Sequence, residues 1–237
     1  MAVSRQSSTG PSRAKCTVIT VRVRNRALYW GFPAAAAALI AFAWLAHGAL
    51  RERTAGLDAA VRNAVHAWAT PGLTFAMLCA TQLGSGPFLI GVGALAIWRL
   101  AAAGRKHAAL LLAVAALGGE ALDQILKLCF HRPRPEAFFG LMDPSTYSFP
   151  SGHALTATCF YGALAALLAA RTRPLAAKAG LWALAAALAA LIGLSRVYLG
   201  VHYPSDVLAG YAAAVVWLAA VRAGYGVWRR RSELTAK

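Results

Sequence analysis

The sequence predicts an all-α protein that crosses a membrane about six times. Of its 237 residues, 59% are hydrophobic and only 14% are charged, whereas soluble domains usually carry about 25% charged residues. Four long segments contain no Asp, Glu, Lys or Arg: 27–50, 73–98, 154–170 and 179–195. Because a spanning helix needs roughly 20 apolar residues, such segments indicate transmembrane helices packed into a bundle.

Six spans are expected in total. Their predicted ranges are 29–50, 73–100, 108–128, 153–170, 175–195 and 204–225. The second range contains Gly84-Ser85-Gly86-Pro87, which is expected to bend the helix because proline interrupts the backbone hydrogen bonds. Two short pieces are the alternative for this range.

The segment 57–68 differs from the spans because its two sides differ in polarity. Apolar residues recur at helical spacing on one side: Leu57, Val61, Val65 and Trp68. Polar residues occupy the other side: Asp58, Arg62, Asn63 and His66. This pattern predicts an amphipathic helix in the membrane interface, anchored by Trp68; a plain surface connector is the alternative.

The distribution of basic residues predicts the orientation in the membrane. The net charge is +16, but the basic residues lie between apolar segments and in both tails. This does not form the single basic stripe that is typical of nucleic-acid binding. With a cytoplasmic N-terminus, most of the 24 Lys and Arg residues fall in cytoplasmic segments, as the positive-inside rule requires. The expected parts are a basic disordered cytoplasmic tail (1–26), a six-span domain (27–228) and a basic cytoplasmic C-terminal tail (229–237).

Three polar blocks at the ends of apolar segments carry the candidate chemistry, and the predicted topology puts all of them on the non-cytoplasmic face. They are Lys127-x6-Arg134-Pro135, Pro150-Ser151-Gly152-His153 and Ser195-Arg196-x5-His202-x3-Asp206. In the third block, Asp206 can orient one imidazole nitrogen of His202 and leave the other as a nucleophile. A structural His–Asp pair at a helix end would have the same spacing.

The second block is typical of an anion site at a helix start. Ser151 is a good N-cap, and Gly152 permits close approach of the backbone. Free N–H groups at a helix N-terminus attract anions. His153 would then be a general acid for a leaving oxygen, whereas an interfacial histidine without a role is the alternative.

The cations of the blocks suit phosphoryl oxygens. Arg134 and Arg196 offer planar forks and Lys127 a point charge; ordinary contacts with lipid head groups are the alternative. His131 and Arg132 are interpreted as lying outside the site. Of the two Arg-Pro pairs, only the second has the six-residue spacing from Lys127.

A further carboxylate is expected beside the first block. Glu120, Asp123 and Lys127 are spaced to share one helix face. Asp123 precedes Lys127 by four residues, which is the favourable orientation for an ion pair. Because ionisable residues in a membrane segment are functional candidates, we expect Asp123 to position Lys127. A carboxylate in a small polar cavity is the alternative.

Taken in order, K-x6-RP, PSGH and SR-x5-H-x3-D resemble the type 2 phosphatidic acid phosphatase (PAP2) superfamily. The motifs span 127–206. The resemblance implies metal-independent hydrolysis of phosphomonoesters or pyrophosphates through a phosphohistidine, with no cofactor. It implies His202 as the nucleophile, Asp206 as its orienting carboxylate and His153 as acid and then base. It also implies a set of phosphate-binding residues: Lys127, Arg134, Ser151, Gly152 and Arg196.

The substrate expected from this resemblance is a lipid phosphate or pyrophosphate whose tails stay in the bilayer. Undecaprenyl pyrophosphate, phosphatidic acid and phosphatidylglycerol phosphate are the main candidates. The site would then face the periplasm or the extracellular side of the cell (inner) membrane. A lipid phosphotransferase of the same superfamily, or a transporter or scaffold that kept the fold, are the alternatives. The oligomeric state stays open.

Overall fold

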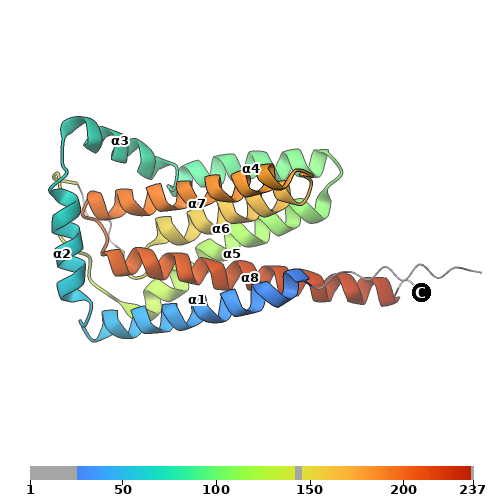
Figure 1. The fold of residues 1–237 in the computed structure, drawn as a ribbon, viewed down its shortest axis with the longest axis horizontal. Helices are drawn as coiled ribbons and strands as arrows, with labels where there is room; N and C mark the ends of the chain where they lie inside the picture. The colour runs from blue at the N-terminus through green and yellow to red at the C-terminus, as the bar shows by residue number, and fades with distance from the viewer. Residues whose placement is uncertain (1–25, 142–145, 236–237) are drawn as a thin grey trace, which may run out of the picture.

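The computed structural model describes residues 26–141 and 146–235, so the tail predicted over 1–26 lies almost wholly outside the described residues. The described chain is helical throughout, with short connections and one longer loop between α5 and α6 (Figure 1). The helices are α1 (Arg26–Leu50), α2 (Ala55–His66), α3 (Pro71–Gln82), α4 (Gly86–Ala102), α5 (Lys106–Phe130), α6 (Gly152–Ala169), α7 (Leu175–Tyr198) and α8 (Pro204–Thr235).

Five helices are long and apolar enough to cross a membrane: α1, α5, α6, α7 and α8. The pair α3 and α4 gives a sixth span if it is counted as one segment, bent by 47°. This confirms the expectation of about six spans, and it places a break where a bend was predicted. Ser85 is the N-cap of α4, and Pro87 lies in its first turn. Proline is tolerated there because the N–H groups of the first turn have no acceptor within the helix, so the N–H that proline lacks is not missed.

Helix α2 runs across one end of the bundle, roughly perpendicular to the spanning helices (Figure 1). The helix itself was predicted, but the residues that face the protein come from both its polar and its apolar set. Asp58 is only 1% exposed, whereas Leu57 and Trp68 are 66% and 60% exposed. Asp58 therefore reaches into the bundle end together with Val65, which is 7% exposed and packs in a hydrophobic cluster with Val197 and Tyr198, whereas Leu57 points away from it.

Small residues allow close packing around α6. This helix contacts α5, α7 and α8, and its buried positions include Ala154, Ala157, Gly162 and Ala165. Small side chains let helix backbones approach closely, which is how membrane helices gain packing energy. As a result, the start of α6 lies beside the ends of α5 and α7 and the start of α8, at the end of the bundle that α2 crosses (Figure 1).

Helix α8 is longer than the predicted sixth span. It begins at Pro204, as expected, but continues to Thr235 instead of ending near residue 225. The basic residues after 228 are therefore helical as far as Thr235.

Candidate active site

The three polar blocks meet at one end of the bundle. His202 lies in the loop between α7 and α8, is 1% exposed, and interacts electrostatically with the three cations predicted for the site: Arg134, Arg196 and Lys127. His153, in the first turn of α6, interacts with the same three cations and with His202. The charged and imidazole groups that the sequence predicted for one site are thus brought together.

The contact between Arg134 and His202 defines the protonation of the imidazole. Arg134 Nη1 lies 3.0 Å from His202 Nε2. A guanidinium can only donate, so Nε2 accepts this hydrogen bond and the ring proton resides on Nδ1. Nδ1 lies 3.5 Å from Asp206 Oδ2 and 3.4 Å from Ser148 Oγ. This is the tautomer that leaves a lone pair on Nε2.

Burial keeps this imidazole neutral. The desolvation of His202 lowers its pKa well below the usual value, and the nearby charges of Arg134, Arg196 and Lys127 lower the pKa further. A neutral imidazole whose Nε2 carries a lone pair and no proton can act as a nucleophile at neutral pH.

Asp206, at the start of α8, is held on both carboxylate oxygens. Its Oδ2 accepts hydrogen bonds from Ser148 Oγ at 2.5 Å and from the backbone N–H of Tyr203 at 3.0 Å. Its Oδ1 accepts one from Arg132 Nη1 at 2.5 Å. The side chain is fully buried, so these contacts fix the carboxylate that faces His202.

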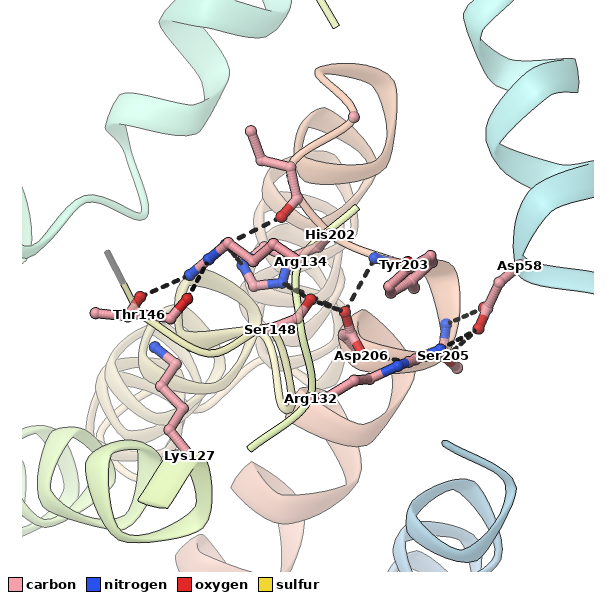
Figure 2. A network of polar contacts seen from close by, with 12 residues as sticks. Asp58, Lys127, Arg132, Arg134, Thr146, Ser148, His202, Tyr203, Ser205 and Asp206 are labelled. Atoms are coloured by element: carbon pink, nitrogen blue, oxygen red, sulfur yellow. Dashed lines mark hydrogen bonds and ion pairs between the residues drawn. The ribbon is translucent and has the colours of Figure 1, made fainter. Parts of the chain in front are cut away.

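Arg132 belongs to the same polar network, so its exclusion on spacing was wrong. Besides Asp206, it contacts Ser205 Oγ at 2.8 Å and Asp58 Oδ2 at 2.9 Å (Figure 2). Burial would lower the pKa of Arg132, but Asp206 and Asp58 outweigh that effect and raise it. The spacing from Lys127 identifies the Arg-Pro pair that reaches His202, and it carries no information about contacts with Asp206. His131 instead packs against Tyr147.

The predicted pair of Asp123 and Lys127 is present beside the start of α6. The ammonium lies 2.7 Å from Asp123 Oδ2, and both residues are buried. A Cβ on Gly152 would lie 2.8 Å from that carboxylate oxygen and 3.0 Å from Lys127 Nζ. Only glycine leaves room for the pair at this position. Glu120 does not contact Lys127; its carboxylate accepts a hydrogen bond from Gln124, whose side-chain nitrogen also lies 3.5 Å from Asp123 Oδ2.

Buried donors at this bundle end are available for an anion. Ser151 Oγ and Arg196 Nε have no hydrogen-bond partner among the described residues, and Arg196 is held through Nη1 by Thr81 Oγ1 at 2.8 Å. Unpaired buried donors are costly, and a phosphate group has the acceptor oxygens that would satisfy them. The first-turn N–H groups of α6 add to the same positive end.

Sequence reasoning missed several polar residues that hold the site: Asp58, Thr81, Thr146, Ser148 and Ser205. Most reach across long separations, such as the 147 residues between Asp58 and Ser205, so local spacing could not reveal them. One signal was present for Asp58. The chain has only eight acidic residues, so a carboxylate beside apolar segments is a candidate for a buried ion pair.

A helical membrane bundle with two histidines and three cations around an anion site defines a membrane protein built to handle phosphate-like groups. Residues 108–230 match the PAP2 superfamily, which is just over half of the chain. The protein belongs to this superfamily.

Individual relatives agree with this assignment. The chain is 40% identical to phosphatidylglycerophosphatase B of Bacillus subtilis (strain 168) over 96 residues, which are 40% of this chain and 47% of that protein. It is 36% identical to the lipid A 1-phosphatase of Rhizobium etli over 100 residues, which are 38% of this chain and 39% of that protein. The matched regions thus span less than half of either relative.

The fold agrees over a longer range. The crystal structure of the transmembrane PAP2-type phosphatidylglycerolphosphate phosphatase from Bacillus subtilis superposes with a TM-score of 0.75 at 28% identity, covering 81% of this chain and 96% of that one. The similarity therefore extends over most of the bundle, beyond the three polar blocks.

Proposed function

We propose that this protein is a metal-independent lipid phosphate phosphatase that works through a phosphohistidine on His202. The observation that carries the proposal is the oriented, neutral imidazole, whose Nε2 lone pair lies 3.0 Å from Arg134. The names of the two curated relatives and of the solved structure, all lipid phosphatases, support the same reaction.

In the first step, a phosphate oxygen replaces Nε2 as the acceptor for Arg134, because an anionic oxygen is the stronger acceptor. Nε2 of His202 then attacks phosphorus while the bond to the leaving-group oxygen breaks. His153 donates a proton to that oxygen. Asp206 stabilises the positive charge that develops on the ring of His202.

In the second step, His153 takes a proton from water. The water oxygen attacks phosphorus, the N–P bond breaks, and inorganic phosphate and His202 are released. The charge on the transferring group is offset throughout by fixed donors, so no metal ion is required. These donors are Lys127, Arg134, Ser151, Gly152 and Arg196.

The protein is a multi-pass membrane protein, and we place the site on the non-cytoplasmic side. The basic residues of the α4–α5 and α6–α7 connections lie at the opposite end of the bundle from the site, as the alternation of the helices requires. The positive-inside rule assigns that end to the cytoplasm. A lipid substrate would then present its phosphate at the outer face.

Among lipid phosphates, phosphatidylglycerol phosphate is the first candidate. It is the substrate named for the Bacillus subtilis phosphatase whose crystal structure covers 81% of this chain. Phosphatidic acid, lipid A 1-phosphate and undecaprenyl pyrophosphate present a phosphate of the same kind to the three cations, so the site itself does not distinguish them.

The decisive assay measures phosphate release from these four lipids in detergent micelles, with EDTA present. The wild-type protein is expected to release phosphate from at least one of them, and His202→Ala to lose at least about 1,000-fold in kcat. A wild-type protein inactive on all four, or a His202→Ala variant near the wild-type rate, would overturn the proposal.

A further inference from the structure

Helix α2 sends a single carboxylate into the active-site network. We propose that Asp58, acting through Arg132, is a positioning residue that holds Asp206 and thereby the tautomer of His202. This inference rests on the proposed function. It assigns to α2 a role in catalysis, whereas the sequence suggested only an interfacial helix.

Within the described residues, every side-chain hydrogen bond of Asp58 goes to Arg132 or Ser205, which contact or adjoin Asp206. Its Oδ1 accepts from the backbone N–H of Ser205 at 2.9 Å. Its Oδ2 accepts from Ser205 Oγ at 2.7 Å and from Arg132 Nη2 at 2.9 Å. Ser205 directly precedes Asp206, so Asp58 fixes the first turn of α8 as well as the guanidinium.

Arg132 is clamped between two carboxylates (Figure 2). One nitrogen of its fork contacts Asp58 and the other contacts Asp206. Its guanidinium carbon also lies 4.1 Å from the centroid of the Tyr203 ring. A planar fork held at both nitrogens has one orientation, so the direction of the donor to Asp206 depends on Asp58.

The charges of the cluster lead to the same conclusion. Arg132 lies between two buried carboxylates, each of which is under 3% exposed at its side chain. With Asp58 present, the guanidinium is shared, and Asp206 keeps enough negative charge to hold the Nδ1 proton of His202. Without Asp58, the whole positive charge would act on Asp206 and weaken its hold on that proton.

Arg62 offers a matched control because it anchors the same helix and, among the described residues, has no hydrogen bond or ion pair to Asp58, Arg132 or Asp206. Its guanidinium carbon lies 5.7 Å from the centroid of the Tyr203 ring. Arg62 lies one turn after Asp58 and donates to the backbone carbonyls of Glu136 at 2.7 Å and Gly200 at 3.1 Å. Its guanidinium also stacks over Phe138 at 4.7 Å. A substitution of Arg62 therefore shows how kcat and the melting temperature change when α2 is only held less firmly.

The test compares Asp58→Asn, Asp58→Glu and Arg62→Gln in the full-length protein in micelles. For Asp58→Asn we expect kcat to fall about 10- to 100-fold, as misplaced catalytic groups do. We expect KM and inhibition by vanadate to stay within about twofold, because the phosphate cations are untouched. Asp58→Glu keeps the charge and should recover part of kcat. Arg62→Gln should lower the melting temperature while kcat is retained.

A second measurement does not depend on activity. In ¹⁵N-histidine NMR spectra, the His202 resonances are identified as those missing from His202→Asn. They should show the Nδ1–H tautomer in the wild type and a mixture of tautomers in Asp58→Asn. Parallel losses of kcat and melting temperature in Asp58→Asn and Arg62→Gln, or an unchanged tautomer in Asp58→Asn, would overturn the positioning role. If instead no lipid phosphate is hydrolysed by the wild type, the proposed function fails, and the NMR comparison still decides the role of Asp58.

Discussion

The ammonium of Lys127 lies 2.7 Å from the carboxylate of Asp123, and the two groups occupy the space that a side chain at Gly152 would need. The pair, which lies near the end of α5, therefore packs closely against the N-terminus of α6, where a phosphate is expected to bind. The ion pair with Asp123 holds the ammonium of Lys127 in this position.

Asp123→Asn should reduce kcat by about 10- to 100-fold, because Lys127 loses the partner that orients it and small displacements of charged groups are costly. Phosphate release from the preferred lipid and the Ki of inorganic phosphate measure the effect. Glu120→Gln is the control, since Glu120 bonds Gln124 and not Lys127. If Asp123→Asn matches Glu120→Gln in both quantities, Asp123 has no role in positioning.

Gly152→Ala should be more damaging than its size suggests. The new methyl group would lie 2.8 Å from Asp123 Oδ2 and 3.0 Å from Lys127 Nζ, so the ion pair must move away from the helix start. We expect kcat/KM to fall by about 100-fold. Gly180→Ala, in α7, meets nothing within 4 Å and should retain kcat/KM. Equal activity of the two variants would contradict the close approach.

The sequence could predict the elements and the groups that act on phosphate, because both follow local rules. Uninterrupted apolar length predicted the spans, and i,i+4 spacing predicted the contacts of Asp123 with Lys127 and of Asp206 with His202. The predicted topology put the polar blocks on the same side of the membrane, which a shared site requires, and the structure brings their side chains together.

The contacts between distant segments could not be predicted in this way. Asp58 was assigned to the polar side of an amphipathic helix in the membrane interface, and its burial against Ser205 and Arg132 was not predicted. An amphipathic pattern shows that a helix has two different sides, and it does not show which side meets protein. At this bundle end, the polar Asp58 and the apolar Val65 of the helix are both buried.

Arg134→Lys should lower kcat/KM by about 100-fold although the charge is kept. The guanidinium contacts the carbonyls of Thr146 and Val201 and Nε2 of His202 at the same time, and a single ammonium cannot reproduce that fork. Steady-state kinetics should show both a lower kcat and a higher KM. Arg99→Lys, at an exposed position in α4, is the control for a general loss of arginine. An Arg134→Lys variant that performs like Arg99→Lys would show that charge alone suffices.

The depressed pKa of His202 makes a prediction about stability and pH. In the unfolded chain this imidazole takes up a proton near its usual pKa of about 6.5, but in the folded protein burial and the neighbouring cations oppose protonation. Below pH 6.5 the unfolded state therefore binds more protons, so stability falls as pH decreases towards the folded-state pKa. The slope from this one group is at most about 1.4 kcal/mol per pH unit. Above about pH 7.5 the group is almost fully neutral in both states and contributes almost no pH dependence.

Thermal unfolding in detergent from pH 8 to pH 5 checks this expectation when the wild type is compared with His202→Asn. Other titrating groups act in both proteins and cancel to first order in the difference. The difference in melting temperature should be nearly constant above about pH 7.5, and the wild type should lose melting temperature relative to His202→Asn as the pH falls further. A difference that stays constant down to pH 5 would show that His202 is protonated as readily in the folded protein as in the unfolded chain. The imidazole would then be largely cationic at mildly acidic pH, which is incompatible with a nucleophile kept neutral by burial.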